Sequence, residues 1–314
     1  MEVAVVNKVE FYYDSADMIT KIHAIKWVPE DEIICILQIA HGMLEHIDRY
    51  DEFANAMAKL GIVVSGNDHL GHGTSLINEE SRGFFSEIDG NKTVVEDIHK
   101  LGSILKKEYS DVPYFILGHS MGSFLVRQYI TINNKGIDGA LIIGTGYQPY
   151  YLLKLGLIIT KIIANHKGWR YRSKFVTNLV FGKNNKKFEP SRTNVDWLSR
   201  DDKIVDKYKS DKKINFIFTL NSYYNMFKGM LCLYDKNNLA KMSKDLPIIL
   251  LSGYNDPVGN FGSDVLKLYK NYMKLEMRDV SYKLYKDDRH EILNELDRET
   301  VYKDIEEWIL NHIS

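Results

Sequence analysis

Short unbroken runs of hydrophobic residues alternate along this chain with longer segments of helical spacing. An unbroken apolar run is typical of a strand that is buried on both faces of a parallel sheet. Such runs occupy residues 33–40, 62–66, 114–117, 140–143 and 247–251, and residues 280–285 are expected to form a last strand. Apolar side chains that recur every three or four residues predict helices at 50–60, 94–109, 262–277 and 299–313. The alternation predicts an α/β fold with a mostly parallel central sheet flanked by helices.

Two features modify this picture. Residues 9–13 and 19–25 are strand-like and are joined by turn residues, which predicts an antiparallel hairpin ahead of the parallel strands. Residues 146–243 interrupt the alternation and contain 19 Lys and Arg against 7 Asp and Glu, a net charge of +12, whereas the rest of the chain has −13. We therefore predict an acidic α/β body, residues 1–145 and 244–314, that carries a basic insertion at 146–243.

Local helical spacing and the two cysteines give narrower predictions. In the first helix Phe53, Met57 and Leu60 are expected to share one face. Cys35 and Cys232 lie far apart in the sequence and are expected to be small buried hydrophobic residues rather than a disulfide. No Cys/His cluster has zinc spacing, so no metal site is predicted.

Other segments bear on location. No uninterrupted apolar stretch reaches the length of a membrane-spanning helix, about 18 residues. The first residues lack the basic region and long apolar core of a signal peptide. A soluble, cytoplasmic protein is the default expectation.

The segment Gly118-His119-Ser120-Met121-Gly122 is the strongest candidate for chemistry. It follows a buried strand and precedes a helix-like run, which is the context of a G-x-S-x-G nucleophile elbow. A strand that turns at once into a helix forces strained backbone angles on its corner residue, and the flanking glycines leave room for the crowding. The alternative interpretation is an ordinary Gly-rich turn. In the functional interpretation Ser120 is the nucleophile.

A serine hydroxyl needs a base, and the base needs an orienting acid. Only His166, His290 and His312 follow Ser120, and only His290 comes directly after a predicted strand of the body. Asp256 follows the strand that ends near residue 251, at the same edge of the sheet. We therefore expect Ser120, Asp256 and His290 to form a catalytic triad; a surface histidine and an ordinary turn aspartate are the alternatives.

An oxyanion hole requires two backbone N–H groups. One should come from Met121, the residue after the nucleophile. The other should come from the loop after the first buried strand, where His41-Gly42-Met43 offers the N–H of Met43.

These motifs together resemble a known family. The segments HGMLEHIDRY (41–50), DHLGHGTS (68–75), GHSMG (118–122), LSRD (198–201), DPV (256–258) and RHE (289–291) are similar to those of monoacylglycerol lipases and related lysophospholipase-like serine hydrolases. The resemblance implies the α/β-hydrolase fold, a helical cap formed by residues 146–243, and cleavage of ester-linked acyl chains without a cofactor. It also implies that Glu45 and Arg49 lie near the alcohol side of the pocket; a solvated salt bridge is the alternative.

The start of the insertion is apolar around most of a helix. Residues 150–163 leave only a narrow polar stripe at Lys154 and Lys161, and Tyr150 and Tyr151 are candidate substrate-binding residues. A helix packed inward over the pocket is one interpretation. The other is contact with an anionic membrane surface, aided by four nearby cations: Lys167, Arg170, Arg172 and Lys174. Nucleic-acid binding is not predicted, because no recognised motif accompanies the charge.

The sequence therefore predicts a serine hydrolase acting on carboxylic esters of medium or long acyl chains, such as monoacylglycerols or lysophospholipids. A small-ester carboxylesterase and an aminopeptidase-like amidase are the alternatives among enzymes. Epoxide opening on this fold would require an aspartate at the elbow, where Ser120 stands. A non-catalytic binding module on the same fold is the alternative outside enzymes.

Overall fold

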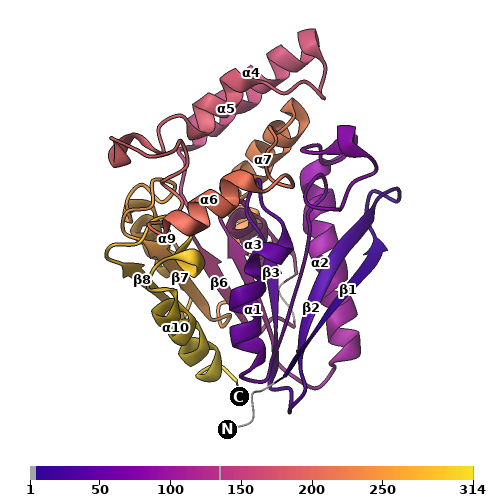
Figure 1. The fold of residues 1–314 in the computed structure, drawn as a ribbon, viewed down its shortest axis with the longest axis vertical. Helices are drawn as coiled ribbons and strands as arrows, with labels where there is room; N and C mark the ends of the chain where they lie inside the picture. The colour runs from indigo at the N-terminus through magenta and orange to yellow at the C-terminus, as the bar shows by residue number, and fades with distance from the viewer. Residues whose placement is uncertain (1–4, 134–135, 314) are drawn as a thin grey trace.

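An eight-stranded sheet forms the centre of the protein. A computed structural model describes residues 5–133 and 136–313 (Figure 1). The strand order is β1-β2-β4-β3-β5-β6-β7-β8. The β1–β2 and β2–β4 pairs are antiparallel, and the other five pairs are parallel. The strands are β1 Val6–Asp14, β2 Lys21–Pro29, β3 Cys35–Ala40, β4 Ile62–Asn67, β5 Tyr114–His119, β6 Gly139–Ile143, β7 Ile248–Gly253 and β8 Val280–Tyr285.

Helices cover both faces of this sheet (Figure 1). One face packs against α2 (Gly90–Glu108), α3 (Met121–Ile132) and α9 (Ser263–Lys274). The other packs against α1 (Asp51–Ala58) and α10 (Arg298–Leu310). Every residue of β3, β4, β5, β6 and β7 is buried, because these strands lie between two helical layers. The prediction of a mostly parallel sheet flanked by helices is confirmed.

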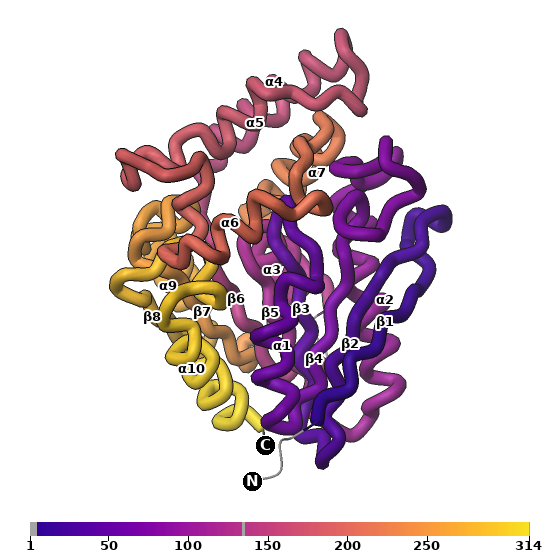
Figure 2. The backbone as a smooth tube through the Cα atoms, in the orientation of Figure 1, coloured from indigo at the N-terminus to yellow at the C-terminus, as the bar shows by residue number. Residues whose placement is uncertain are grey.

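The segment between β6 and β7 leaves the sheet and returns to it (Figure 2). We call residues 146–243 the cap segment; its boundaries as a separate unit stay a prediction. Figure 1 shows α4 and α5 at the far end of the molecule, and α7 packs against α4 as well as against α2 and α3 of the body. The helices are α4 Tyr150–Lys167, α5 Lys174–Phe181, α6 Asp202–Ser210, α7 Leu220–Cys232 and α8 Lys236–Leu239. Short 3-10 helices occur at Ile47–Tyr50, Glu79–Ser81, Lys186–Phe188 and Ile292–Asn294.

The structure bears on the predictions for the opening hairpin, the first helix and the two cysteines. The opening hairpin is confirmed, with β1 and β2 paired over their whole length. The prediction that Leu60 shares a helical face with Phe53 and Met57 is wrong, because α1 ends at Ala58. Cys35 is buried in β3 as predicted, whereas Cys232 is exposed near the end of α7, so burial was predicted wrongly there.

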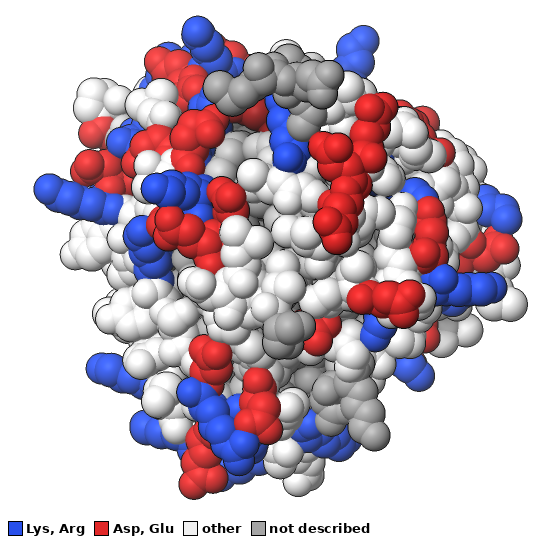
Figure 3. Space-filling model, turned by 90° about the horizontal axis from the view of Figure 1, so that it is seen from below, with Lys and Arg blue, Asp and Glu red and all other residues white. Residues whose placement is uncertain are grey.

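The surface opposite α4 and α5 carries Lys and Arg interspersed with Asp and Glu (Figure 3). Charges of both signs lie close together across this face, so it offers no extended field of one sign to a charged partner. Within residues 5–133 and 136–313, no helix has both the length and the apolar character needed to cross a membrane.

Candidate active site

Ser120 occupies a strained corner between β5 and α3. Its backbone angles are φ 53° and ψ −117°, a region that residues other than glycine rarely adopt. The corner is also crowded. A Cβ atom on Gly118 would lie 2.4 Å from the carbonyl oxygen of Gly122, and one on Gly122 would lie 1.9 Å from that of Ala40. Two glycines are therefore needed so that the chain can turn at once and present the Ser120 side chain.

Asp256 and His290 lie together at the ends of β7 and β8. His290 Nδ1 is 3.0 Å from Asp256 Oδ2, and both side chains are almost fully buried. The ring N–H does not point straight at this oxygen, so the contact is close without being an aligned hydrogen bond. Asp256 is fixed by the N–H of Val258, 2.8 Å from Oδ1, and by the hydroxyl of Ser252, 3.3 Å from Oδ2.

His290 also packs against the nucleophile elbow. Its ring centroid lies 4.8 Å from that of His119, the residue immediately before Ser120. The structure thus brings the ends of β5, β7 and β8 together, as the chain order of the three predicted residues required.

The loop after β3 holds Met43 near Ser120. Met43, Ser120 and Met121 line the same cavity. Met121 is the first residue of α3, so its N–H has no partner within the helix. His41 accepts a hydrogen bond at Nε2 from the N–H of His69, 3.0 Å away, so its proton is on Nδ1, which donates to the Gly42 carbonyl at 2.8 Å. That carbonyl and the Met43 N–H belong to one peptide group, so His41 orients the N–H.

Three buried histidines support this loop in the neutral form. Burial, followed by the proximity of His69 and His72, lowers the pKa of His41 well below its usual range. Burial likewise lowers the pKa of His69 to about 3 and that of His72 to about 4. Neutral rings keep one acceptor and one donor nitrogen each, which the His41–His69 contacts require.

Glu45 and Arg49 belong to a buried charge network. Glu45 Oε1 lies 2.9 Å from His119 Nδ1, and Arg49 makes a bidentate pair with Glu291 at 2.9 and 2.8 Å. Glu45 Oε2 accepts from the Tyr50 hydroxyl at 2.9 Å and lies 3.5 Å from Arg49. The alternative of a solvated salt bridge is wrong, because the side chains of Arg49 and Glu45 are only 9% and 6% exposed.

The network fixes charge next to the elbow. Burial favours the neutral carboxyl of Glu45, but His119 and Arg49 outweigh it and lower the pKa to about 2. Burial also disfavours the charged form of His119, yet Glu45 raises its pKa above the ordinary value. Both ring nitrogens of His119 face acceptors, Nδ1 the Glu45 carboxylate and Nε2 the His290 carbonyl 3.3 Å away, an arrangement that favours the charged form of His119.

An apolar cavity of about 360 Å³ opens at Ser120. Helices α4, α5 and α7 of the cap segment supply much of its wall, with residues that include Leu153, Ile159, Val180, Phe181, Met226 and Phe227. The described lining does not include Glu45, Arg49, Tyr150 or Tyr151. Tyr150 and Tyr151 are 49% and 69% exposed on the outer side of α4, so the structure does not bring these two predicted substrate residues to the cavity.

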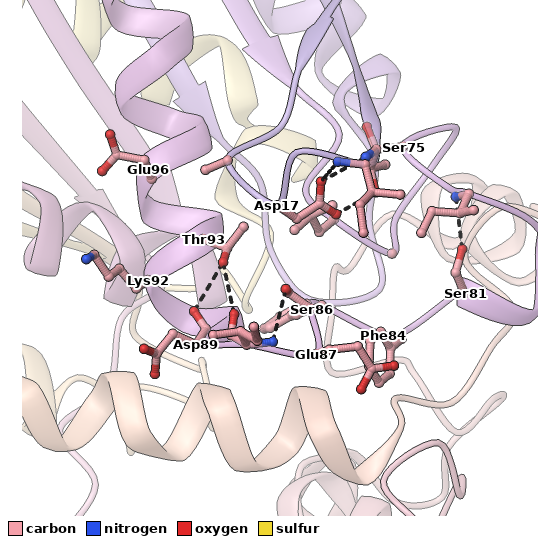
Figure 4. Close-up of a pocket in the computed structure, with 18 of the residues that line it drawn as sticks. Asp17, Ser75, Ser81, Phe84, Ser86, Glu87, Asp89, Lys92, Thr93 and Glu96 are labelled. Atoms are coloured by element: carbon pink, nitrogen blue, oxygen red, sulfur yellow. Dashed lines mark hydrogen bonds between the residues drawn. The ribbon is translucent and has the colours of Figure 1, made fainter.

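A second hollow of about 630 Å³ lies beside the N-terminus of α2 (Figure 4). Figure 4 shows that its polar groups bond to one another: Asp17 accepts from Thr20, and Thr93 donates to the Asp89 carbonyl. Glu87 is paired with Arg170 and Asp89 with Lys228. No histidine or cysteine occurs in its described lining, so we find no nucleophile–base pair there. The smaller cavity at Ser120 is the candidate site.

Three carboxylates could in principle hold a cation. Oxygens of Asp288, Glu295 and Asp297 lie within 4.8 Å of one another. The guanidinium of Arg200 already contacts all three, with 2.5 Å to Asp288 Oδ1 and 3.0 Å to Glu295 Oε2. This cluster joins the cap segment to the loop that carries His290.

Sequence reasoning did not identify His119, Glu291 or Trp197 as site residues. His119 lies within the elbow motif and Glu291 follows His290, so position next to a motif was an available signal. Trp197 packs on the His290 ring from within the cap segment, and nothing in the sequence indicated this contact.

Both a family model and individual relatives can be compared with this chain. A family model described as Hydrolase_4, serine aminopeptidase S33, matches residues 31–297. The chain is 26% identical over 291 residues to a monoglyceride lipase homolog of monkeypox virus, an alignment covering 91% of this chain and 93% of that protein. It is 27% identical over 307 residues to the monoglyceride lipase of Mus musculus, covering 92% and 86%.

A solved structure is also similar over the whole chain. The crystal structure of a thermostable carboxyl esterase from Bacillus coagulans in complex with glycerol superposes with a TM-score of 0.90 and 28% identity. The superposition covers 99% of this chain and all of that one, so the similarity includes the cap segment.

Proposed function

Because this chain belongs to the serine aminopeptidase S33 family of α/β-hydrolases, we propose that it is a serine hydrolase that cleaves carboxylic esters of medium or long acyl chains, as monoglyceride lipases do. The observation that carries the proposal is Ser120, held in a strained corner at the mouth of an apolar cavity, next to a buried His290–Asp256 pair.

The proposed mechanism uses groups at the ends of separate strands. Ser120 Oγ attacks the ester carbonyl while His290 accepts its proton, and Asp256 stabilises the imidazolium that forms. The Met43 and Met121 N–H groups bind the oxyanion, each contributing about 3 kcal/mol to transition-state stabilisation. His290 returns the proton to the leaving alcohol, and water then hydrolyses the acyl-serine.

The cavity supports an acyl rather than a peptide substrate. Its described lining contains no acidic residue that could bind a free amino terminus and is dominated by aliphatic, aromatic and methionine side chains. Burial of methylene groups there would contribute about 0.8 kcal/mol each, which favours longer chains. We propose a glycerol or similar polar alcohol as the leaving group. The contact predicted between this alcohol and Glu45 or Arg49 stays a prediction, and the cytoplasm stays the predicted location.

A substrate panel tests the proposal. We expect kcat/KM for p-nitrophenyl esters and monoacylglycerols to rise with acyl chain length, and no turnover of aminoacyl amides. Hydrolysis confined to acetyl and butyryl esters would support the small-ester alternative. Preferential cleavage of aminoacyl amides would support the aminopeptidase-like one.

The outer surface of α4 and α5 supports a second proposal, contact with an anionic lipid surface. Large apolar side chains outside the cavity lining are exposed along both helices: Ile158, Ile162 and Phe175. Residues 139–188 contain no Asp or Glu, and Lys154, Lys161, Lys167 and Lys174 lie on these helices. Two of the predicted cations are otherwise engaged, because Arg170 pairs with Glu87 and Arg172 donates to the Arg82 carbonyl.

Vesicle sedimentation tests this contact. We expect binding to anionic vesicles at low salt, weakened in an Ile158→Ser/Ile162→Ser variant. Ile132→Ser is the matched control, because Ile132 is equally exposed but lies on α3 of the body. Equal binding of all three proteins would contradict a role for α4, and no binding by the wild type would refute the membrane contact.

A further inference from the structure

Two aromatic rings pack against the His290 ring. One is that of His119, and the other is the Trp197 indole, whose ring centroid lies 4.9 Å from that of His290 at an interplanar angle of 41°. Asp256 alone does not define the plane of the imidazole, since His290 Nδ1 is close to Asp256 Oδ2 but not aligned with it. The two rings therefore limit how far the imidazole can rotate.

The cap segment reaches His290 through a stretch of turns and bends, residues 196–200. This stretch lies against the loop that carries His290 and accepts backbone hydrogen bonds from it. The His290 N–H donates to the Trp197 carbonyl at 3.3 Å, and the Glu291 N–H donates to the Leu198 carbonyl at 2.7 Å. Arg289 donates to the Asp196 carbonyl at 2.5 Å, and Arg200 pairs with Asp288 and Glu295.

Trp197 is itself fixed by two further contacts. Its backbone N–H donates to Asn185 Oδ1 at 3.0 Å, and its ring stacks on that of Phe181, with centroids 6.1 Å apart and an angle of 29°. Phe181 lines the cavity at Ser120. Successive ring contacts, Phe181 with Trp197 and Trp197 with His290, thus join the acyl cavity to the histidine.

We propose that Trp197 is a positioning residue for His290, so that part of the catalytic apparatus is supplied by the cap segment. The inference rests on the proposed role of Ser120 and His290. The indole restricts the imidazole to the orientation in which it can accept the Ser120 proton. An indole face near the ring also favours the imidazolium that forms during attack, through a cation–π interaction. Trp197 is not among the described residues that line the cavity at Ser120.

The test separates this role from ester specificity by using fluorophosphonate labelling of Ser120. Labelling requires a serine activated by its base but no acyl-ester turnover. We expect Trp197→Leu to lower the second-order labelling rate constant about 10-fold per folded molecule, and Trp197→Phe to restore most of it. kcat for esters should fall by a similar factor with KM nearly unchanged, because the indole does not bind the substrate.

Two controls make the outcome decisive. Trp169→Leu removes a second cap-segment tryptophan, which packs on Tyr224, and should leave the labelling rate unchanged. Thermal unfolding of each variant establishes the folded fraction at the assay temperature. A Trp197→Leu protein that is folded and labels at the wild-type rate overturns the positioning role. A wild type that does not label overturns the proposed function, and with it the role of Trp197.

Discussion

Glu45 and His119 form a buried ion pair beside the nucleophile, with Glu45 Oε1 2.9 Å from His119 Nδ1. Both side chains are withdrawn from water, and Glu45 supplies the carboxylate that compensates the charge of His119. Removing one partner of such a pair leaves the other charge buried and unpaired, which typically costs about 3–5 kcal/mol. We therefore predict that Glu45→Gln lowers the free energy of unfolding by about 3 kcal/mol near pH 6. Urea denaturation measures this change.

The cost of Glu45→Gln should depend on pH. The pKa of His119 is raised above its ordinary 6.5, so its contribution to stability is fully present below pH 6.5 and is lost as pH rises through the folded value. The pKa of Glu45 is lowered to about 2, so its contribution is present above 4.5 and is lost as pH falls toward 2. The difference in unfolding free energy between wild type and Glu45→Gln should therefore narrow as the pH rises above 6.5. If the difference in unfolding free energy between wild type and Glu45→Gln did not change with pH, the ion pair between Glu45 and His119 would be contradicted.

Asp288 should make the protein less stable as the pH rises. Burial, and then its proximity to Asp297 and Glu295, raise the pKa of this carboxyl from 3.8 to about 8. Because the folded state then binds a proton that the unfolded state has lost, stability falls between those two values. Asp288→Asn keeps an oxygen for Arg200 and removes the charge, so we expect a shallower decline in unfolding free energy across this range. Asp287→Asn, at the exposed neighbouring position, is the control. If the unfolding free energy of both variants fell equally steeply with pH, the raised pKa would not belong to Asp288.

Two glycines at the site should respond differently to alanine. A Cβ on Gly122 would lie 1.9 Å from the Ala40 carbonyl, which is rigid backbone, so Gly122→Ala should lower Tm sharply. A Cβ on Gly42 would meet side-chain atoms rather than backbone, Glu45 Oε1 at 2.4 Å and Ser120 Cβ at 3.1 Å. Gly42→Ala should therefore lower Tm less than Gly122→Ala does, and it should lose at least about 10-fold in kcat, because the oxyanion loop and the nucleophile are displaced. Equal effects on Tm would contradict this distinction.

His41 should affect turnover through the peptide group that it holds. Its Nδ1–H donates to the Gly42 carbonyl, which orients the Met43 N–H. His41→Ala frees this peptide, and we predict a fall in kcat of about 10- to 100-fold with little change in KM. His72→Phe is a useful comparison, because His72 packs in the same histidine cluster without contacting Gly42. A kcat for His41→Ala equal to that of the wild type would remove His41 from the mechanism.

The sequence predicted those parts of the site that are encoded locally. An apolar run followed by a Gly-rich turn placed Ser120 at a strand end, and the order of later strands indicated Asp256 and His290. No sequence pattern indicated the contacts between side chains that lie far apart in the sequence. Arg49 and Glu291 are 242 residues apart, and Trp197 reaches His290 only because the cap segment folds back along the loop after β8. The end of the first helix was mispredicted, because α1 stops at Ala58 before it reaches Leu60. Burial was mispredicted at Cys232, because the type of a residue does not show what covers it.

Ser120 is proposed as the nucleophile of an esterase. This role is tested most directly by comparing wild type and Ser120→Ala in hydrolysis of a long-chain monoacylglycerol, with circular dichroism and Tm to establish that the variant is folded. We expect the folded variant to lose at least about 10³-fold in kcat. Turnover by folded Ser120→Ala at the wild-type rate would contradict the role of Ser120 as nucleophile.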